Sequence, residues 1–330
     1  MPTASLLVCD DSNMARKQLL RALPADWPVT VSQAANGEEA LEQLRAAHFD
    51  LLLLDLTMPV LDGYGVLAAL KAEGRAQNVI VVSGDVQEEA IRRVKELGAL
   101  AFLKKPADPE LLRQTLDQLG FLRVAEAATT TTLPEPKVSF RDAFREVVNV
   151  AMGRAAALLA RVLGVFVQLP IPNVNILEVS ELHMALADAQ RGDGLTAVCQ
   201  GYIGEGIAGE ALLIFHDSEV ADMARLMQWQ QHNHSSMEML LDMSSILIGA
   251  CLSGIAEQLD VSFSQGHPQI LGEHASIDEL IRINSQRWRK TLAVEVSYSI
   301  EGHDIHFDLL LLFTEDSVSL LTDKLAYLME

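Results

Sequence analysis

The sequence predicts an α/β domain of parallel strands followed by an internally duplicated α+β domain. Three observations support this: strand and helix patterns alternate over residues 1–121, periodicity is lost between 125 and 137, and a repeat follows. A chain of 330 residues is longer than a usual single domain. We expect a first domain over 1–121, a linker over 122–137 and a second domain over 138–330.

Short apolar runs in the first domain have the length and composition of buried strands. They are SLLVC (5–9), VTVSQ (29–33), DLLLLDL (50–56), NVIVVSG (78–84) and LAFLKK (100–105). Amphipathic helical patterns lie between them, for example over 38–47 and 88–97. This alternation predicts a parallel sheet with helices on both faces.

The second domain contains a repeat with an offset of 96 positions. DAFREVVNVAMG (142–153) and EMLLDMSSILIG (238–249) have the same polar spacing, and Pro172 and Pro268 are related by the same offset. Each half, about 138–233 and 234–330, has a long helix, alternating strands and a closing helix. We therefore expect a duplicated fold with pseudo-twofold symmetry and antiparallel strands.

The long helix of each half carries a polar stripe at steps of four, three and four residues. In the first half the stripe is Asp142, Glu146, Asn149 and Gly153, and in the second it is Glu238, Asp242, Ser245 and Gly249. Such steps place the side chains on one helix face. The opposite face of the first helix, expected to be buried, has Phe140, Phe144, Val147, Ala151, Leu158 and Val162.

Composition excludes some classes of partner. A net charge of −20 argues against nucleic-acid binding, which needs clustered Lys and Arg. The three cysteines have no metal-type spacing and are interpreted as core residues of a reduced protein. We find no leader pattern and no apolar run long enough for a membrane span, so we expect a cytoplasmic protein with no membrane partner.

The chemistry of the first domain is expected at the carboxyl ends of its strands. Asp10 and Asp11 end the first predicted strand and Asp55 ends the third. Three carboxylates repel one another unless a cation lies among them, and all-oxygen ligands suit Mg²⁺. Ser83 and Lys105 end the fourth and fifth strands. A carboxylate nucleophile, Mg²⁺, a hydroxyl and an ammonium together can hold a phosphoryl group in transfer.

Residues 4–120 resemble a response-regulator receiver domain of the CheY type. The matching pieces are Asp10 with Asp11, DLTMPVLDG from Asp55, VVSGD at Ser83 and FLKKP at Lys105, with a cis bond expected before Pro106. The resemblance implies a flavodoxin-like fold and a histidine kinase of the CheA type as phosphodonor. It further assigns Asp55 as phosphoacceptor, the Thr57 carbonyl as a fourth Mg²⁺ ligand, Ser83 as switch hydroxyl and Phe102 as switch aromatic residue.

Residues 138–330 resemble the CheC, FliY and CheX phosphatases of chemotaxis, whose motif is Asp or Ser, then Glu, Asn and Gly at the spacing of the first stripe. In that family the Glu pairs with the active-site lysine of a phosphorylated receiver and the Asn holds water in line with phosphorus. The resemblance assigns these roles to Glu146 and Asn149, with Asp142 and Gly153 completing the site. The stripe at 238–249 departs from the motif because Asp242 replaces Glu and Ser245 replaces Asn, so we expect a weak or inactive second site.

The leading interpretation is a signalling enzyme that hydrolyses the aspartyl phosphate of a separate CheY-like receiver, with Asp55 phosphorylation setting its activity. A variant acts on Asp55 of its own chain or of a second copy in a homodimer. The rival is a binding module that captures phosphorylated receivers or a CheD-like partner without turnover. Substitution of Asn149 distinguishes the enzyme from the binding module.

Overall fold

The structure is a computed structural model that describes residues 4–122, 135–178, 194–227, 235–275 and 290–329. It divides into two compact units, the first comprising residues up to Glu146 together with Met329, and the second Val147–Leu328. The division lies inside helix α6 (Phe140–Leu163), so the first turns of that helix belong to the first unit. The domain boundaries at 121 and 138 stay a prediction.

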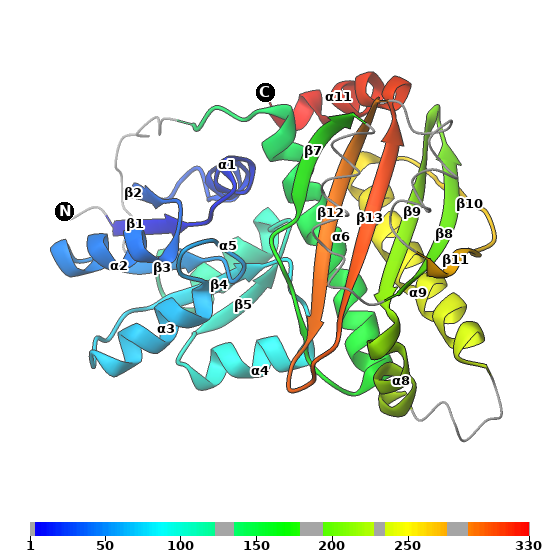
Figure 1. The fold of residues 1–330 in the computed structure, drawn as a ribbon. Helices are drawn as coiled ribbons and strands as arrows, with labels where there is room; N and C mark the ends of the chain where they lie inside the picture. Colours follow the sequence, from blue (N-terminus) through cyan, green and yellow to red (C-terminus); the bar gives the residue numbers. More distant parts are fainter. Residues whose placement is uncertain (1–3, 123–134, 179–193, 228–234, 276–289, 330) are drawn as a thin grey trace. The chain divides into compact units, whose positions relative to one another are not determined.

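The first unit contains a five-stranded parallel sheet (Figure 1). Its strands are β1 (Ala4–Cys9), β2 (Val29–Ala34), β3 (Leu51–Leu54), β4 (Val79–Ser83) and β5 (Ala101–Lys104), in the spatial order β2-β1-β3-β4-β5. All four pairings are parallel. The predicted fold class of this part of the chain is confirmed.

Two hydrophobic cores cover the two faces of this sheet. The helices are α1 (Asn13–Ala22), α2 (Gly37–Ala46), α3 (Gly63–Ala72), α4 (Glu88–Glu96) and α5 (Pro109–Gln118). Leu6 and Val8 of β1 pack with residues of α1 and α5, whereas Leu7 and Cys9 pack with residues of α2, α3 and α4. This alternation follows from the two-residue period of a strand, and a strand buried on both faces is apolar throughout.

The second unit contains the antiparallel sheet and two long helices. In chain order the first half has α6, β6 (Val167–Gln168), β7 (Asn173–Glu178), β8 (Leu195–Gly204), β9 (Ile207–His216) and α8 (Asp217–Leu226). The second half repeats this with α9 (Ser236–Leu259), β10 (Ser264–Gln265), β11 (Gln269–Ala275), β12 (Lys290–Ile300), β13 (His306–Thr314) and α11 (Glu315–Met329). The predicted duplication is confirmed.

The two halves exchange strands. The hairpins β8–β9 and β12–β13 join through an antiparallel pairing of β9 with β13. At the outer edges, β10 and β11 of the second half pair with β8 of the first, and β6 and β7 of the first half pair with β12 of the second. Each half therefore completes the sheet of the other.

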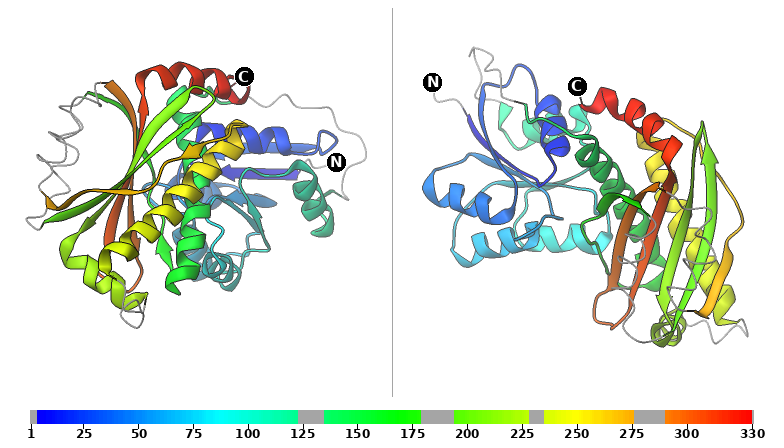
Figure 2. Two further views of the ribbon diagram at one scale, coloured as in Figure 1. Left: turned by 90° about the vertical axis from the view of Figure 1, so that its right-hand side faces the viewer. Right: turned by 45° about the horizontal axis from the view of Figure 1, so that its top comes forward.

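Helices α6 and α9 lie across the same face of this sheet (Figures 1 and 2). They approach closely where Gly254 of α9 faces Ala151 of α6, since a Cβ added at Gly254 would lie 2.8 Å from the Ala151 Cα. The side chain of Gln258 donates to the main-chain carbonyl of Val147, 2.8 Å away. Glycine permits the backbones to come this close.

Burial corrects one expectation about α6. Phe144, Val147 and Ala151 are buried as predicted, but Leu158 is 43% exposed and Val162 46% exposed. Periodicity identifies the apolar face of a helix, but the length of that face that is covered depends on its neighbours. The expectation that Leu158 and Val162 are buried is therefore wrong.

Helix α9 corrects another expectation. By length and composition Ser236–Leu259 is apolar enough to cross a membrane, so the view that no segment qualifies is wrong. In the apolar 18-residue stretch of this helix, however, 56% of the residues are buried inside the protein. A buried core helix meets the same criterion of length and hydropathy.

Candidate phosphoryl-transfer site

The predicted acidic and basic residues of the first unit meet at one edge of its sheet. Asp10 and Asp11 directly follow β1, Asp55 follows β3, Ser83 ends β4 and Lys105 follows β5. These four strands are neighbours in the sheet, so their carboxyl ends lie side by side. Open parallel sheets bind their ligands at this edge, next to the carboxyl ends of the strands.

The backbone around Asp55 holds its carboxylate in place. The Leu56 amide donates to Asp55 Oδ1 at 2.8 Å, and the Asp55 amide donates to the Cys9 carbonyl at 2.9 Å. A Cβ added at Gly63 would lie 2.2 Å from the Asp55 carbonyl oxygen. Only glycine allows the start of α3 to pack this closely behind the acidic residue.

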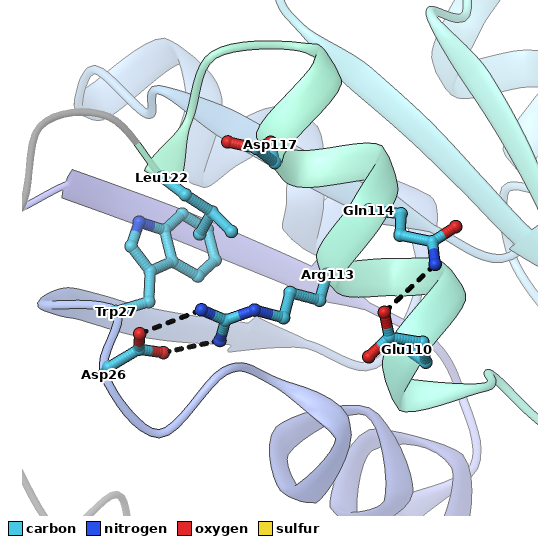
Figure 3. A pocket seen from close by; sticks show the side chains of 7 residues that line it. All are labelled: Asp26, Trp27, Glu110, Arg113, Gln114, Asp117 and Leu122. Carbon is cyan, nitrogen blue, oxygen red and sulfur yellow. Dashed lines mark hydrogen bonds and ion pairs between the residues drawn. The ribbon is translucent and has the colours of Figure 1, made fainter.

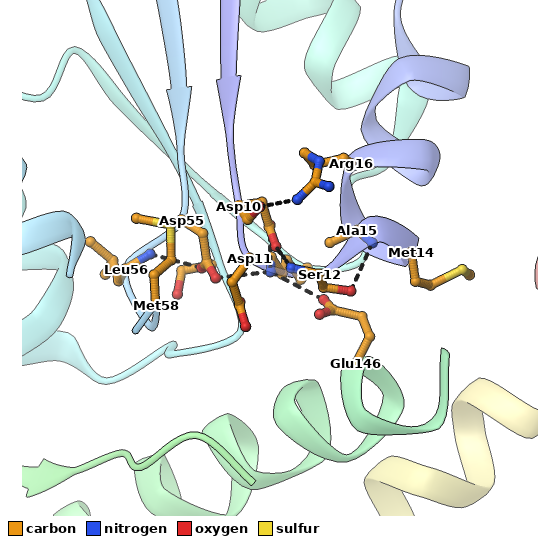
Figure 4. A network of polar contacts seen from close by, with 12 residues as sticks. Asp10, Asp11, Ser12, Met14, Ala15, Arg16, Asp55, Leu56, Met58 and Glu146 are labelled. Atoms are coloured by element: carbon orange, nitrogen blue, oxygen red, sulfur yellow. Dashed lines mark hydrogen bonds and ion pairs between the residues drawn. The ribbon is translucent and has the colours of Figure 1, made fainter. Parts of the chain in front are cut away.

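One ammonium group contacts three carboxylates in this site. Lys105 Nζ lies 2.7 Å from Asp10 Oδ2, 3.1 Å from Asp55 Oδ2 and 3.1 Å from Glu146 Oε1. All four side chains are buried. Figure 4 shows Glu146 pointing from α6 toward the aspartates at the end of β1 and β3. The structure therefore brings Glu146 to the lysine beside Asp55.

This excess of negative charge perturbs the ionisation of the site. Burial raises the pKa of Glu146 to about 7, although the Lys105 ammonium opposes the shift. Burial also raises the pKa of Asp55 well above its ordinary value, again against Lys105. For Lys105, burial alone would lower the pKa, but the surrounding carboxylates raise it well above its ordinary value. One lysine does not neutralise the cluster, so part of it stays protonated near neutral pH.

The acidic cluster fits a magnesium ion. Carboxylate oxygens of Asp10, Asp11 and Asp55 lie within 4.8 Å of one another. Three hard oxygen donors with more negative charge than the nearby Lys105 ammonium neutralises suit Mg²⁺, which keeps several waters and is held by few carboxylates. Thr57, the predicted fourth ligand, is half-buried two residues after Asp55.

Ser83, Phe102 and the bond before Pro106 complete the predicted features of this unit, and the roles of Ser83 and Phe102 stay predictions. The Ser83 side chain is fully buried and its hydroxyl accepts a hydrogen bond from the Asp85 amide at 3.2 Å. Phe102 lies on β5, partly buried against the core under α2, α3 and α4. The bond between Lys105 and Pro106 is cis, as predicted.

Two further residues in the first turns of α6 contact other parts of the first unit. The Asp142 carboxylate accepts hydrogen bonds from the main-chain amides of Asn13 (3.2 Å) and Met14 (2.8 Å) at the start of α1. Arg145 Nη2 lies 3.1 Å from Asp11 Oδ2 and 3.6 Å from Asp142 Oδ1. Sequence reasoning missed Arg145, and the available signal was its place between two motif acids, three residues after one and one before the other.

The remaining motif residues of α6 continue along the same helix. Asn149 lies three residues after Glu146 and is 7% exposed, and Gly153 is buried. Because α6 is one continuous helix, Asn149 lies on the same face as Glu146, about 4.5 Å further along the axis.

The second stripe, on α9, has a different environment. Glu238 accepts from the amide of Ser235 at 3.0 Å, while the Ser235 hydroxyl accepts from the Glu238 amide, so the pair forms a capping box. Asp242 and Ser245 are exposed and Gly249 is half-buried. In this second copy the first acid of the stripe therefore stabilises the start of its own helix.

A separate pocket of about 440 Å³ lies between α5 and the loop before β2 (Figure 3). Its charged side chains include Arg113 and Asp26, which form an ion pair with 2.7 Å between Arg113 Nη1 and Asp26 Oδ1. Trp27 and Leu122 supply its apolar wall. None of the predicted site residues lines it.

The sequence of the first unit matches a protein family. Residues 6–117, about a third of the chain, match the model of the response regulator receiver domain. These residues are a receiver domain. The receiver domain makes the chain a two-component signalling protein, and receivers use an acidic cluster such as Asp10, Asp11 and Asp55 for Mg²⁺.

Curated relatives are similar in sequence to part of this chain. A protein-glutamate methylesterase/protein-glutamine glutaminase of Myxococcus xanthus is 37% identical over 48% of this chain and 46% of its own length. The transcriptional regulatory protein ZraR of Escherichia coli O157:H7 is 34% identical over 38% of this chain and 28% of its own length. The chain thus spans less than half the length of these relatives.

Solved structures show further similarities. Thermotoga maritima FliY is 19% identical, with 60% of this chain and 99% of that chain covered at a TM-score of 0.45. The CheX-CheY-BeF3-Mg complex from Borrelia burgdorferi matches with 28% identity, covering 35% of this chain and 88% of that chain at a TM-score of 0.33.

Proposed function

We propose that this protein is an aspartyl-phosphate phosphatase whose substrate is its own receiver domain. Residues 138–330 act as a CheC-like domain on the phosphorylated Asp55. The observation that carries the proposal is the 3.1 Å contact between Glu146 Oε1 and Lys105 Nζ, with Lys105 also 3.1 Å from Asp55. In the family that residues 138–330 resemble, the equivalent Glu pairs with the active-site lysine of a receiver.

The proposed reaction is hydrolysis of an acyl phosphate. The bond between phosphorus and Asp55 Oδ breaks, a water oxygen bonds to phosphorus, and the products are the Asp55 carboxylate and inorganic phosphate, which takes the proton from water. An acyl phosphate is already reactive, so the protein has only to place the water in line and avoid repulsive charge at that point.

Each residue has a limited role in this scheme. Asp10, Asp11 and Asp55 hold Mg²⁺, which when bound supplies charge neutralisation for the phosphoryl oxygens. Glu146 holds Lys105, and Asn149, one turn further along α6, orients the water with a neutral amide. A carboxylate at position 149 would repel the phosphoryl oxygens, whereas an amide does not.

The test follows the decay of phosphorylated Asp55 in the full chain. The protein is phosphorylated with a small phosphodonor and Mg²⁺, the donor is removed, and decay is measured over a hundredfold range of protein concentration. We expect a first-order rate that is independent of concentration and falls about a hundredfold in Asn149→Ala, because a misplaced water costs rate on this scale.

Other outcomes identify the alternatives. A rate that rises with protein concentration would indicate action between chains. Unchanged decay in Asn149→Ala, with the same fraction phosphorylated, would contradict the enzyme and favour the binding module. Action on a separate CheY-like receiver is measured by adding Asp55→Asn protein, with and without Asn149→Ala, to that labelled receiver.

A further inference from the structure

The start of α6 directs an acidic side chain away from its own helix. Ser139 precedes α6, and its hydroxyl accepts the hydrogen bond of the Asp142 main-chain amide at 3.2 Å. Ser139 thus caps the start of α6, and the Asp142 carboxylate makes its hydrogen bonds outside this helix. It accepts hydrogen bonds from the main-chain amides of Asn13 and Met14, which are 129 and 128 positions away in the sequence.

These two amides are the first of α1, and a helix leaves its first amides without an internal partner. Ser12 is the N-cap of α1. Its hydroxyl accepts a hydrogen bond only from the third amide of the helix, that of Ala15, at 3.1 Å. Asp142 supplies an acceptor for the first two. An anion at a helix N-terminus is further stabilised by the helix dipole.

The corresponding acid of the second repeat makes a different contact. Glu238, 96 positions after Asp142, folds back to the amide of its own cap residue, Ser235. Two acids at the same position of two repeated helices thus have different roles, one within its helix and one toward the receiver domain. Helix capping alone does not explain the contacts of Asp142.

Arg145 stabilises this arrangement from the side. Its guanidinium lies between Asp142 and Asp11, at 3.6 and 3.1 Å. The Asp142 side chain is 12% exposed and that of Arg145 30% exposed, so both ion pairs are partly shielded from solvent. The three residues Asp142, Arg145 and Glu146 therefore contact α1, Asp11 and Lys105 respectively.

We propose that Asp142 is a positioning residue that completes the N-terminal cap of α1 and so sets the place at which α6 presents Glu146 to Lys105. This inference rests on the proposed function. Asp142 lies one turn before Glu146 on α6, and its two amide partners lie three and four residues after Asp10, a partner of Lys105. A contact on one turn fixes the translation and rotation of the next turn, since a helix is stiff over this length.

The first readout is hydrogen exchange of individual amides in the full-length protein. We expect the Asn13 and Met14 amides to exchange at least tenfold faster in Asp142→Ala than in wild type, while the Ala15 amide, bonded to Ser12, is unchanged. Asp142→Asn, which keeps an acceptor oxygen, should retain part of the protection. A general loss of stability would accelerate all three amides together.

The second readout is the decay of phosphorylated Asp55. We expect about a tenfold slower decay in Asp142→Ala and a smaller effect in Asp142→Asn. The matched control is Asp316→Ala, which removes an exposed acid from the first turn of α11 and should leave the rate unchanged.

The outcomes separate this inference from the proposed function. If Asn149→Ala slows decay but Asp142→Ala leaves both decay and amide exchange at wild-type values, Asp142 has no positioning role and the phosphatase stands. If Asn149→Ala does not slow decay, the proposed function fails. Unprotected Asn13 and Met14 amides in the wild type would by themselves overturn the cap.

Discussion

At the scale of single residues, the excess of carboxylates over cations around Lys105 governs the site. Asp10, Asp55 and Glu146 share one buried ammonium, and Asp11 lies beside them. Burying like charges together is unfavourable unless protons or a cation compensate them. Stability and metal binding should therefore both respond to single substitutions here.

Glu146→Gln should change the dependence of stability on pH. The pKa of Glu146 is raised by burial from 4.5 to about 7, so the folded protein holds this proton more tightly than the unfolded chain. Binding of this proton to Glu146 stabilises the folded protein. That contribution is fully present below about pH 4.5 and is lost as pH rises through 7. Urea unfolding without Mg²⁺ should show wild type losing roughly 3 kcal/mol relative to Glu146→Gln over this range. A constant difference would contradict the assignment.

Arg145→Ala should tighten Mg²⁺ binding. The guanidinium lies 3.1 Å from Asp11, so it competes with a cation for the same carboxylate. Removing one positive charge near a divalent ion should contribute roughly 1 kcal/mol, or about a fivefold lower Kd. Titration calorimetry with Mg²⁺ measures this directly. Arg145→Lys is the control, since it keeps the charge, and equal Kd values in all three proteins would refute the competition.

At the scale of elements, α6 is a single helix that serves two purposes. Its first turns contact the receiver domain through Asp142, Arg145 and Glu146, and its later turns pack against α9 at Ala151. Helix continuity relates Glu146 to Asn149 by fixed geometry. The α6–α9 contact should therefore be sensitive to the size of the side chain at Gly254.

Gly254→Val should destabilise the second unit. Its Cβ would lie 2.8 Å from the Cα and Cβ of Ala151, so the helices must separate or shift. Overpacking of this kind costs roughly 1–3 kcal/mol. Gly201→Val on β8 is the control, because its Cβ would meet nothing within 4 Å. Thermal unfolding should show a lower Tm for the first variant only, and equal Tm values would contradict the close contact.

At the scale of the whole molecule, strand exchange makes the two repeats interdependent. The edge strands of each half pair with the hairpin of the other half, and the hairpins meet at β9 and β13. A half alone would leave long strand edges unpaired, which favours aggregation over folding. The duplicated sheet is therefore expected to fold as one cooperative unit.

Fragments test this interdependence. Residues 138–227 and 235–330 should each lack a cooperative unfolding transition when produced alone, whereas residues 138–330 should unfold in one. Circular dichroism during urea titration measures both. A cooperative transition in either fragment would show that the exchanged strands are dispensable.

The sequence by itself determined the local features of this protein. Apolar runs and helical periodicity predicted the strands of the parallel sheet, the 96-residue offset predicted the duplication, and the acids and lysine after β1, β3 and β5 predicted a cluster of acidic side chains around a lysine. The strand and helix patterns are local, the duplication is visible as similarity within the sequence, and the carboxyl ends of parallel strands meet by geometry. Such features need no knowledge of how distant segments pack.

Tertiary structure alone decided which distant groups meet. Asp142 with the α1 amides, Arg145 with Asp11, and Gly254 with Ala151 join positions about 100 to 130 residues apart, and no local pattern encodes those pairings. The exposure of Leu158 was mispredicted for the same reason, since periodicity names a face but not what covers it. Contacts between distant segments depend on the path of the whole chain, because each is stable only when the elements on both sides are already in place.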